Sequence, residues 1–260
     1  MRITDDQERI LDTYKCVRLN KIPNAQQLIQ AFHSVRGKSL VQYLAKFGVN
    51  EDTSGKTAFY FILSPDGIPC VYFSLQCGAL FDSPFDTQRH IAYINANVSS
   101  TDPNVQNIVY NKNQILSLYG DDIKKETGRQ IWRVEHLYPS VELVHFCAND
   151  DKKEEWKSYG FRFPMGAVLF WKYVVPILDN IRNNVGCEYL HLFAADNTPD
   201  ETLINHYTVA LGLAKEDSLG TTKPRYDFSC VFLSQRISTL LSGRQKFFDD
   251  FNTDPGEDVV

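Results

Sequence analysis

The amino-acid sequence predicts a mixed α/β fold, in which a central mixed β-sheet is flanked by helices on both faces. Residues 141–147 are a short, mostly apolar run with β-branched and aromatic side chains, as in an interior strand, and residues 187–194 read as a second buried strand. Each run is followed by apolar residues at helical spacing, and this alternation favours a sheet that is covered on both sides. A hydrophobic content of 43% in 260 residues is sufficient for one large core.

The expected elements follow from the spacing of apolar residues and from turn chemistry. Ser64-Pro65-Asp66-Gly67 is typical of a hairpin turn, because proline presets the bend and glycine tolerates a positive φ. Pro176 should kink or loosen one turn of the longest helix. In chain order we expect strand 14–19, helix 25–36, helix 39–47, strands 57–63 and 68–75, strand 141–147, a helix from about 164 to 181, strand 187–194, helix 200–213 and strand 227–235.

We expect a single domain over residues 1–260. The polar stretch 78–130, which Pro84 and Pro103 interrupt, is interpreted as an insertion over one edge of the sheet. The regular order of strands and helices at residues 141–235 forms the expected core half, where the function should lie.

Charge, cysteine spacing and hydropathy argue against several classes of protein. A net charge of −5 and a pI of about 5.7 give no reason to expect general nucleic-acid binding, which needs a basic face. The six cysteines form no CxxC pair, so no metal site is expected. No apolar run approaches the ~20 residues of a membrane span, and the N-terminus lacks an apolar signal core. We therefore expect no membrane partner and a cytoplasmic location.

The loop that opens the long helix has the chemistry of an anion site. The first N–H groups of a helix are unpaired and lie at the positive end of its dipole. Gly160 and Gly166 would let the main chain approach an anion closely, and Arg162 would add a charge contact to a phosphate oxygen.

This order of elements resembles the acetyl-CoA-binding half of the GNAT N-acetyltransferases. The resemblance rests on strand 141–147, the helix opening at Pro164-Met165-Gly166-Ala167, and the strand-helix pair 188–213. In that family a Gln/Arg-x-x-Gly-x-Gly/Ala loop holds the diphosphate of CoA. Residues 161–166 match this motif only at Gly166, whereas a window shifted by one matches Arg162 and Ala167. Pro164 has no N–H, so either Met165, Gly166 and Ala167 supply the amides, or the pocket is altered.

The resemblance implies acetyl-CoA as the acyl donor and a place for its pantetheine arm. Main-chain groups of Phe146, Cys147 and Ala148 would pair with that arm where two strands part. Asn197 resembles an Asn that follows the second strand and orients the next helix or the arm; its alternative is a helix N-cap.

The family also implies a tyrosine that protonates the departing thiolate. Tyr207 matches by residue type, but it lies one residue further from Gly212 than is usual. A strict count selects Thr208, and one residue on a helix is a rotation of about 100°.

For the base that removes the amine proton, we expect Glu142, with Glu135 and His145 as alternatives. Strand alternation predicts that Glu142 and His145 point to opposite faces of the sheet. Some family members use a chain of water molecules in place of a dedicated base.

The sequence thus predicts an N-acetyltransferase that acts on a primary amine of an unidentified acceptor by direct attack. One alternative is a GNAT-like module that binds CoA without turnover. Another is an interaction protein whose insertion 78–130 docks on a partner, for instance in a homodimer. A thiol hydrolase built on Cys147 and His145 has no further support in the chain.

Overall fold

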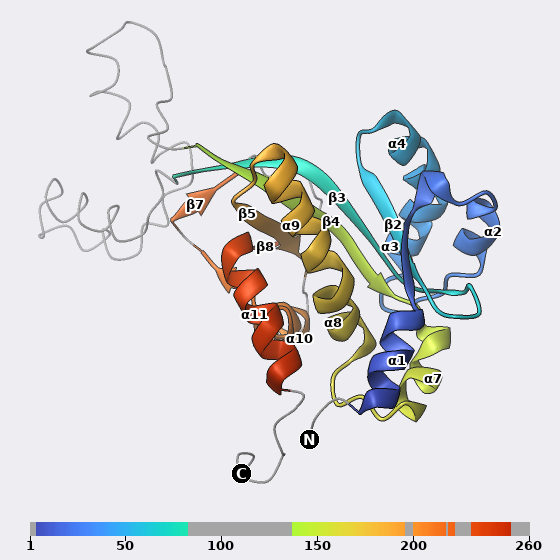
Figure 1. Cartoon of the computed structure of the whole chain (residues 1–260). Helices are drawn as coiled ribbons and strands as arrows, with labels where there is room; N and C mark the ends of the chain where they lie inside the picture. The colour runs from blue at the N-terminus through green and yellow to red at the C-terminus, as the bar shows by residue number, and fades with distance from the viewer. Residues whose placement is uncertain (1–3, 83–136, 196–199, 217, 222–229, 251–260) are drawn as a thin grey trace, which may run out of the picture. The chain divides into compact units, whose positions relative to one another are not determined.

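The computed structural model describes residues 4–82, 137–195, 200–216, 218–221 and 230–250 (Figure 1). The chain divides into two compact units. The first comprises Met1–Ala79, Tyr138–Glu216 and Lys223–Val260, and the second comprises Leu80–Leu137 and Asp217–Thr222.

The elements alternate along the chain much as the apolar spacing predicts. Three π-helical turns, Leu44–Gly48, Phe170–Val174 and His206–Ala210, interrupt or extend the helices. The helices and strands are α1 Asp5–Thr13, β1 Lys15–Arg18, α2 Ala25–Gln30, α3 Lys38–Tyr43, α4 Val49–Ser54, β2 Ala58–Leu63, β3 Pro69–Asp82, β4 Leu137–Ala148, α7 Lys153–Ser158, α8 Met165–Leu169, α9 Val175–Val185, β5 Tyr189–Ala194, α10 Thr202–Asn205, β6 Ala214–Lys215, β7 Leu219–Gly220, β8 Val231–Arg236 and α11 Ile237–Asp250.

The sheet is mixed, as predicted, with the strand order β1-β2-β3-β4-β5-β8-β6. Strands β1, β2 and β3 pair in antiparallel fashion, β4 and β5 are parallel, and β8 is antiparallel to both β5 and β6. In the second unit, the end of β3 pairs with β7, where Phe81 lies opposite Gly220.

Two hydrophobic cores cover the two faces of the sheet. On β3, Val71 and Phe73 enter the larger core, whereas Tyr72 between them enters the smaller one. Because side chains alternate along a strand, the two cores lie on opposite faces. Helices α8, α9 and α11 gather over β4, β5 and β8, and α2, α3 and α4 gather beside β2 (Figure 1).

Several boundaries differ from the sequence-based expectation. The first expected helix stops at Gln30, because the chain beyond it is held by side chains at the end of β4. β3 continues to Asp82, so residues 78–82 belong to a strand and not to the expected insertion. Helices α1, α7 and α11 were not predicted. The remainder of the insertion, residues 83–130, lies outside the described residues.

The long helix runs without a break from Met165 to Val185 and contains one π-turn. The N–H of Val175 donates to the carbonyl of Phe170, which is the wide π spacing. In the same register residue 176 would donate to the carbonyl of Trp171, but Pro176 has no N–H. The expectation that Pro176 loosens one turn is therefore confirmed, and the carbonyl of Trp171 becomes available to another donor.

Candidate active site

Strands β4 and β5 part after a short paired segment. Their parallel pairing consists of Ser140–Tyr189, Val141–Leu190 and Glu142–His191. β4 continues to Ala148 and β5 to Ala194, and within the described residues no pair joins these later parts. The parting of two strands that the resemblance implied is thus present.

The side chains of β4 change phase along the strand. Val141 and Leu143 contact the larger core, and so do Phe146 and Ala148 further on. Leu143 and Phe146 are three residues apart, whereas strict alternation places side chains on the same face only at even separations. One extra residue is therefore accommodated between them. This is the pattern of a β-bulge, which is common beside active sites.

The phase change corrects the expected directions of two candidate bases. Glu142 Oε2 lies 3.9 Å from His191 Nε2, and His145 Nδ1 lies 2.7 Å from Ser74 Oγ. His191 and Ser74 each alternate with larger-core residues on their own strands. Glu142 and His145 therefore lie on the same face, opposite the larger core, and not on opposite faces as alternation predicted.

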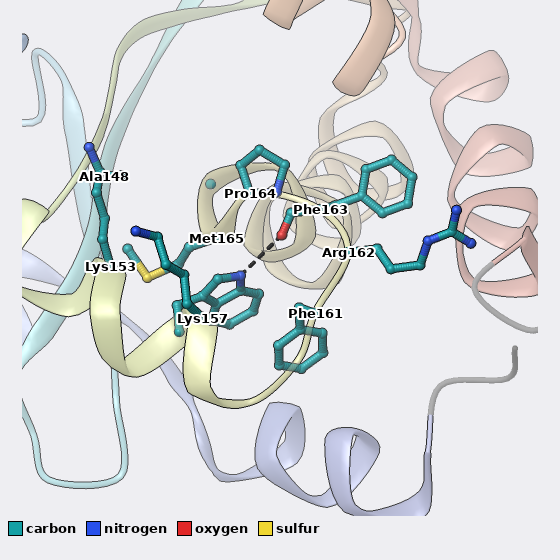
Figure 2. A pocket seen from close by; sticks show the side chains of 10 residues that line it. Ala148, Lys153, Lys157, Phe161, Arg162, Phe163, Pro164 and Met165 are labelled. Atoms are coloured by element: carbon teal, nitrogen blue, oxygen red, sulfur yellow. Dashed lines mark hydrogen bonds between the residues drawn. The ribbon is translucent and has the colours of Figure 1, made fainter. Parts of the chain in front are cut away.

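A pocket of about 340 Å³ lies where β4 ends and the long helix begins. Figure 2 shows Lys153 and Lys157 on one side of it and Arg162 on the other. Its lining residues are Ala148, Lys153, Trp156, Lys157, Phe161, Arg162, Phe163, Pro164, Met165 and Gly166.

The helix N-terminus presents two of the three expected amides to this pocket. The N–H of Ala167 donates to Pro164 O at 3.0 Å, so Ala167 does not supply a free amide as the sequence suggested. Within the described part of the chain, no hydrogen bond uses the N–H of Met165 or Gly166. Two amides at the positive end of a long helix, in a pocket that Lys153, Lys157 and Arg162 also line, suit a diphosphate. Lys153 and Lys157 are ion-paired here with Asp150 and Glu154.

Aromatic packing shapes the loop before the helix. Trp156 and Phe161 stack with ring centroids 4.2 Å apart, and Trp156 Nε1 donates to Phe163 O at 3.1 Å (dashed in Figure 2). Gly160 adopts a φ of +71°, which a side chain would disfavour. Sequence reasoning missed α7, although Lys153 and Lys157 stand one helical turn apart with Trp156 between them.

Tyr207 lies in the π-turn His206–Ala210, and this explains its unusual distance from Gly212. A π-turn holds one residue more than the corresponding α-turn. Tyr207 is five residues before Gly212. Because of the extra residue, its side chain points in the direction that an α-helix would give to the residue four before Gly212. Thr208 bonds through Oγ1 to Ile204 O at 3.1 Å on its own helix. Tyr207, in contrast, is buried.

The surroundings of Tyr207 keep its hydroxyl protonated. Burial raises the pKa of Tyr207 above its ordinary value, and the nearby Cys147 adds to this rise. No hydrogen bond among the described residues uses the Tyr207 hydroxyl. Cys147 itself has a raised pKa because it is buried, which argues against its acting as a thiolate nucleophile.

Glu142 and His191 are opposite each other at the last paired position of β4 and β5, and Ser140 is at the first. His191 and Ser140 are buried, whereas the Glu142 side chain is 16% exposed. Burial raises the pKa of Glu142 and lowers the pKa of His191 to about 4. Ser140 Oγ and His191 Nδ1 have no hydrogen-bond partner in the described structure. Burial thus favours the protonated form of the Glu142 carboxyl, and a perturbed carboxyl beside the parted strands is a candidate proton acceptor.

His145 is held differently. Its ring packs against Tyr43 and Phe59, with centroid distances of 4.6 and 5.6 Å, and burial lowers its pKa to about 4. It is therefore a neutral imidazole at pH 7 that Ser74 orients.

The loop after α2 is fastened to the end of β4 by Asn149 and Asp150. Asn149 is fully buried. Its Nδ2 donates to Pro69 O at 2.8 Å, and its Oδ1 accepts from His33 N at 3.3 Å. Asp150 accepts from Val35 N at 2.7 Å. Sequence analysis missed this clamp, although an Asn-Asp pair directly after a buried strand is typical of a capped turn.

Some expected residues cannot be compared with the structure. Glu135 and Asn197 lie outside the described residues. Phe146 and Cys147 do not line the pocket, whereas Ala148 does. The part of the chain that the structure describes holds no helix able to cross a bilayer and no cluster of three or more metal-ligating side chains.

A mixed sheet whose central parallel strands part beside the N-terminus of a long helix defines a GNAT-type fold, and this chain has that fold. Solved structures that share it include the following three. They are a Tyr-to-Phe mutant of KacT (14% identity, TM-score 0.50, 88% of this chain and 98% of that chain), a Tyr-to-Phe mutant of the AtaT toxin (13%, 0.50, 88% and 92%), and a chain described as a bacterial toxin (9%, 0.50, 89% and 95%). No family model matches the sequence, and no curated protein matches it.

Proposed function

We propose that this protein transfers an acetyl group from acetyl-CoA to a primary amine. The observation that carries the proposal is the parting of β4 and β5 beside a helix N-terminus with two amides, together with the buried Tyr207; no described residue hydrogen-bonds either these amides or the Tyr207 hydroxyl. These are the parts that a diphosphate, a pantetheine arm and a leaving thiolate require.

The donor would lie along the gap between the strands. Its diphosphate would rest on the N–H groups of Met165 and Gly166, with Arg162, Lys153 and Lys157 supplying positive charge. Its pantetheine arm would pass along the main chain of residues 146–148, where β4 pairs with none of the described residues of β5. Asn197 is proposed to orient the arm or the following helix, as the family resemblance implies.

Transfer would proceed by direct attack of the amine on the thioester carbonyl. The new C–N bond forms as the C–S bond breaks, the Glu142 carboxylate accepts the ammonium proton, and the Tyr207 hydroxyl donates a proton to the departing sulfur. Burial suits both roles, because it raises the pKa of Glu142 towards neutrality and keeps Tyr207 protonated.

The first test is donor binding and turnover. We expect acetyl-CoA to bind by isothermal titration calorimetry, and free thiol to appear when a panel of primary amines is added. Binding without thiol release from any amine would favour the non-catalytic module, and no binding would refute the proposal. Light scattering will show whether the protein is a homodimer.

Replacing Tyr207 tests the proposed acid. Tyr207→Phe should lower kcat by about 100-fold, in the usual range for lost acid catalysis, and leave the Kd for acetyl-CoA unchanged. Thr208→Val is the matched control, because a strict sequence count would select Thr208. A Tyr207→Phe enzyme with unchanged kcat removes Tyr207 from the mechanism.

A further inference from the structure

We propose that Trp171, held by the C-terminal helix α11, is a positioning residue for Tyr207. This inference rests on the proposed function and identifies which contacts keep the acid in place. Trp171 Nε1 donates to Ala210 O at 2.8 Å, and Ala210 closes the π-turn that contains Tyr207.

The π-turn needs such an anchor. π-helical turns are rarer than α-helical turns and persist where surrounding contacts hold them. Here the end of the turn is fixed by tertiary hydrogen bonds: Trp171 binds Ala210 O, and Gln235 Nε2 binds Gly212 O at 3.1 Å. Gly212 has a φ of +69°, and a Cβ there would lie 3.4 Å from the Trp171 indole. The indole therefore fits directly against the end of the turn.

Trp171 is in turn held by α11. Arg244 Nε donates to Trp171 O at 2.9 Å, which is the carbonyl that Pro176 leaves without its helical donor. A Cβ at Gly243 would lie 3.1 Å from the indole, and the Phe247 ring stacks on it at 5.5 Å. The two π-turns are thus linked through one indole ring, with α11 behind it.

The anchor decides which residue of the turn, Tyr207 or Thr208, takes the direction required of the acid. If the anchor is lost, the turn can relax to α-helical spacing with Gly212 fixed in place. Thr208 would then take the direction that Tyr207 now has, since one residue is a rotation of about 100°. A threonine hydroxyl is too short and too weakly acidic to replace the phenol.

The test is a double-mutant cycle. Trp171→Phe keeps an aromatic ring but removes the N–H; we expect kcat to fall about 10-fold with the KM for acetyl-CoA unchanged. In a Tyr207→Phe background the same change should have no further effect. Tyr173→Phe is the matched control: it removes a part-buried donor on the same helix, bonded to Leu11 O at 2.7 Å, and should leave kcat unchanged.

A deletion supplies the reciprocal variant. Val209 is 84% exposed. Its deletion should make the turn α-helical and leave Tyr207 four residues before Gly212, in the required direction. The deletion variant should retain turnover, and adding Trp171→Phe to it should leave kcat unchanged. If Trp171→Phe does not fold, Arg244→Gln should show the same split between kcat and KM.

Two results would overturn the inference. One is an unchanged kcat in Trp171→Phe, or in Arg244→Gln where the first variant does not fold. The other is a loss that recurs in full when Tyr207 is already Phe. An unmodified protein without acetyl transfer would refute the proposed function itself, and is recognised before any variant is made.

Discussion

Three ionisable side chains face the same side of the sheet near the point where β4 and β5 part: the buried His145 and His191, and Glu142, which is 16% exposed. Burial drives each towards its neutral form: it raises the pKa of Glu142 and lowers the pKa of both imidazoles to about 4. Among the described residues, the charged group that acts on His145 is Glu51, which partly offsets the effect of burial on its pKa. Near pH 7 both imidazoles are therefore uncharged, and Glu142 is the one of the three whose pKa is raised by burial.

Glu142→Gln should abolish the acid limb of the rate profile. As pH falls through the raised pKa of Glu142, the carboxyl gains a proton and can no longer accept one from the amine, so kcat/KM should fall. In Glu142→Gln, kcat/KM should be lower by about 100-fold or more and should no longer fall over this pH range. The measurement is kcat/KM against pH, with an acceptor amine that stays largely unprotonated over the range.

His145→Gln is the control for that experiment, because His145 lies on the same face of the same strand. If His145→Gln removes the limb and Glu142→Gln does not, the base is the imidazole that Ser74 orients.

At the scale of elements, Lys152 ties the β2–β3 turn to α7. Its side chain is only 9% exposed, and its ammonium lies 2.7 Å from Asp66 Oδ2 and 2.7 Å from Glu155 Oε2. Burial alone would lower the pKa of Lys152, but these two hydrogen bonds outweigh it and raise the pKa to about 12. The same contacts lower the pKa of both carboxyl groups.

Lys152→Met should lower the free energy of unfolding by about 1–2 kcal/mol at pH 7, measured by urea denaturation. The value lies below that for a fully buried pair because the carboxylates retain water contact. Carboxyl groups with lowered pKa stabilise the fold above their unfolded pKa, and this stabilisation is lost as pH falls through the folded pKa. The difference between the two proteins should therefore shrink below about pH 4. Lys215→Met, which breaks an exposed pair with Glu201, should change stability by less than about 0.5 kcal/mol.

For the whole molecule, the two buried imidazoles set how stability depends on pH. An unfolded histidine binds a proton as pH falls through about 6.5, whereas His145 and His191 in the fold do so only near pH 4. The unfolded state then holds more protons, so stability should decrease from about pH 6.5 down to pH 4. The loss is up to about 3 kcal/mol for each imidazole.

Urea unfolding at pH 7.5 and at pH 5 measures this dependence. His191→Asn should reduce it, and His33→Asn is the control because the His33 side chain is 60% exposed. A slope that is unchanged in His191→Asn would contradict the burial of a neutral imidazole.

The sequence by itself determined the mixed sheet, the two buried strands at 141–147 and 187–194, and the helix opening at Met165. It did so because these features depend on apolar spacing and on local turn chemistry, which lie within a few neighbouring residues. It also selected Tyr207 and Glu142 by residue type.

Only the tertiary structure decided which way those side chains point. The phase change in β4 brings Glu142 and His145 to one face. The π-turn buries Tyr207 in the larger core near Cys147, whereas Thr208 bonds to its own helix. Each depends on one extra residue, and that residue is held in place by partners distant in sequence, such as Trp171 at Ala210. The spacing of neighbouring residues does not predict such contacts, because their free energy is gained only when separate elements pack together.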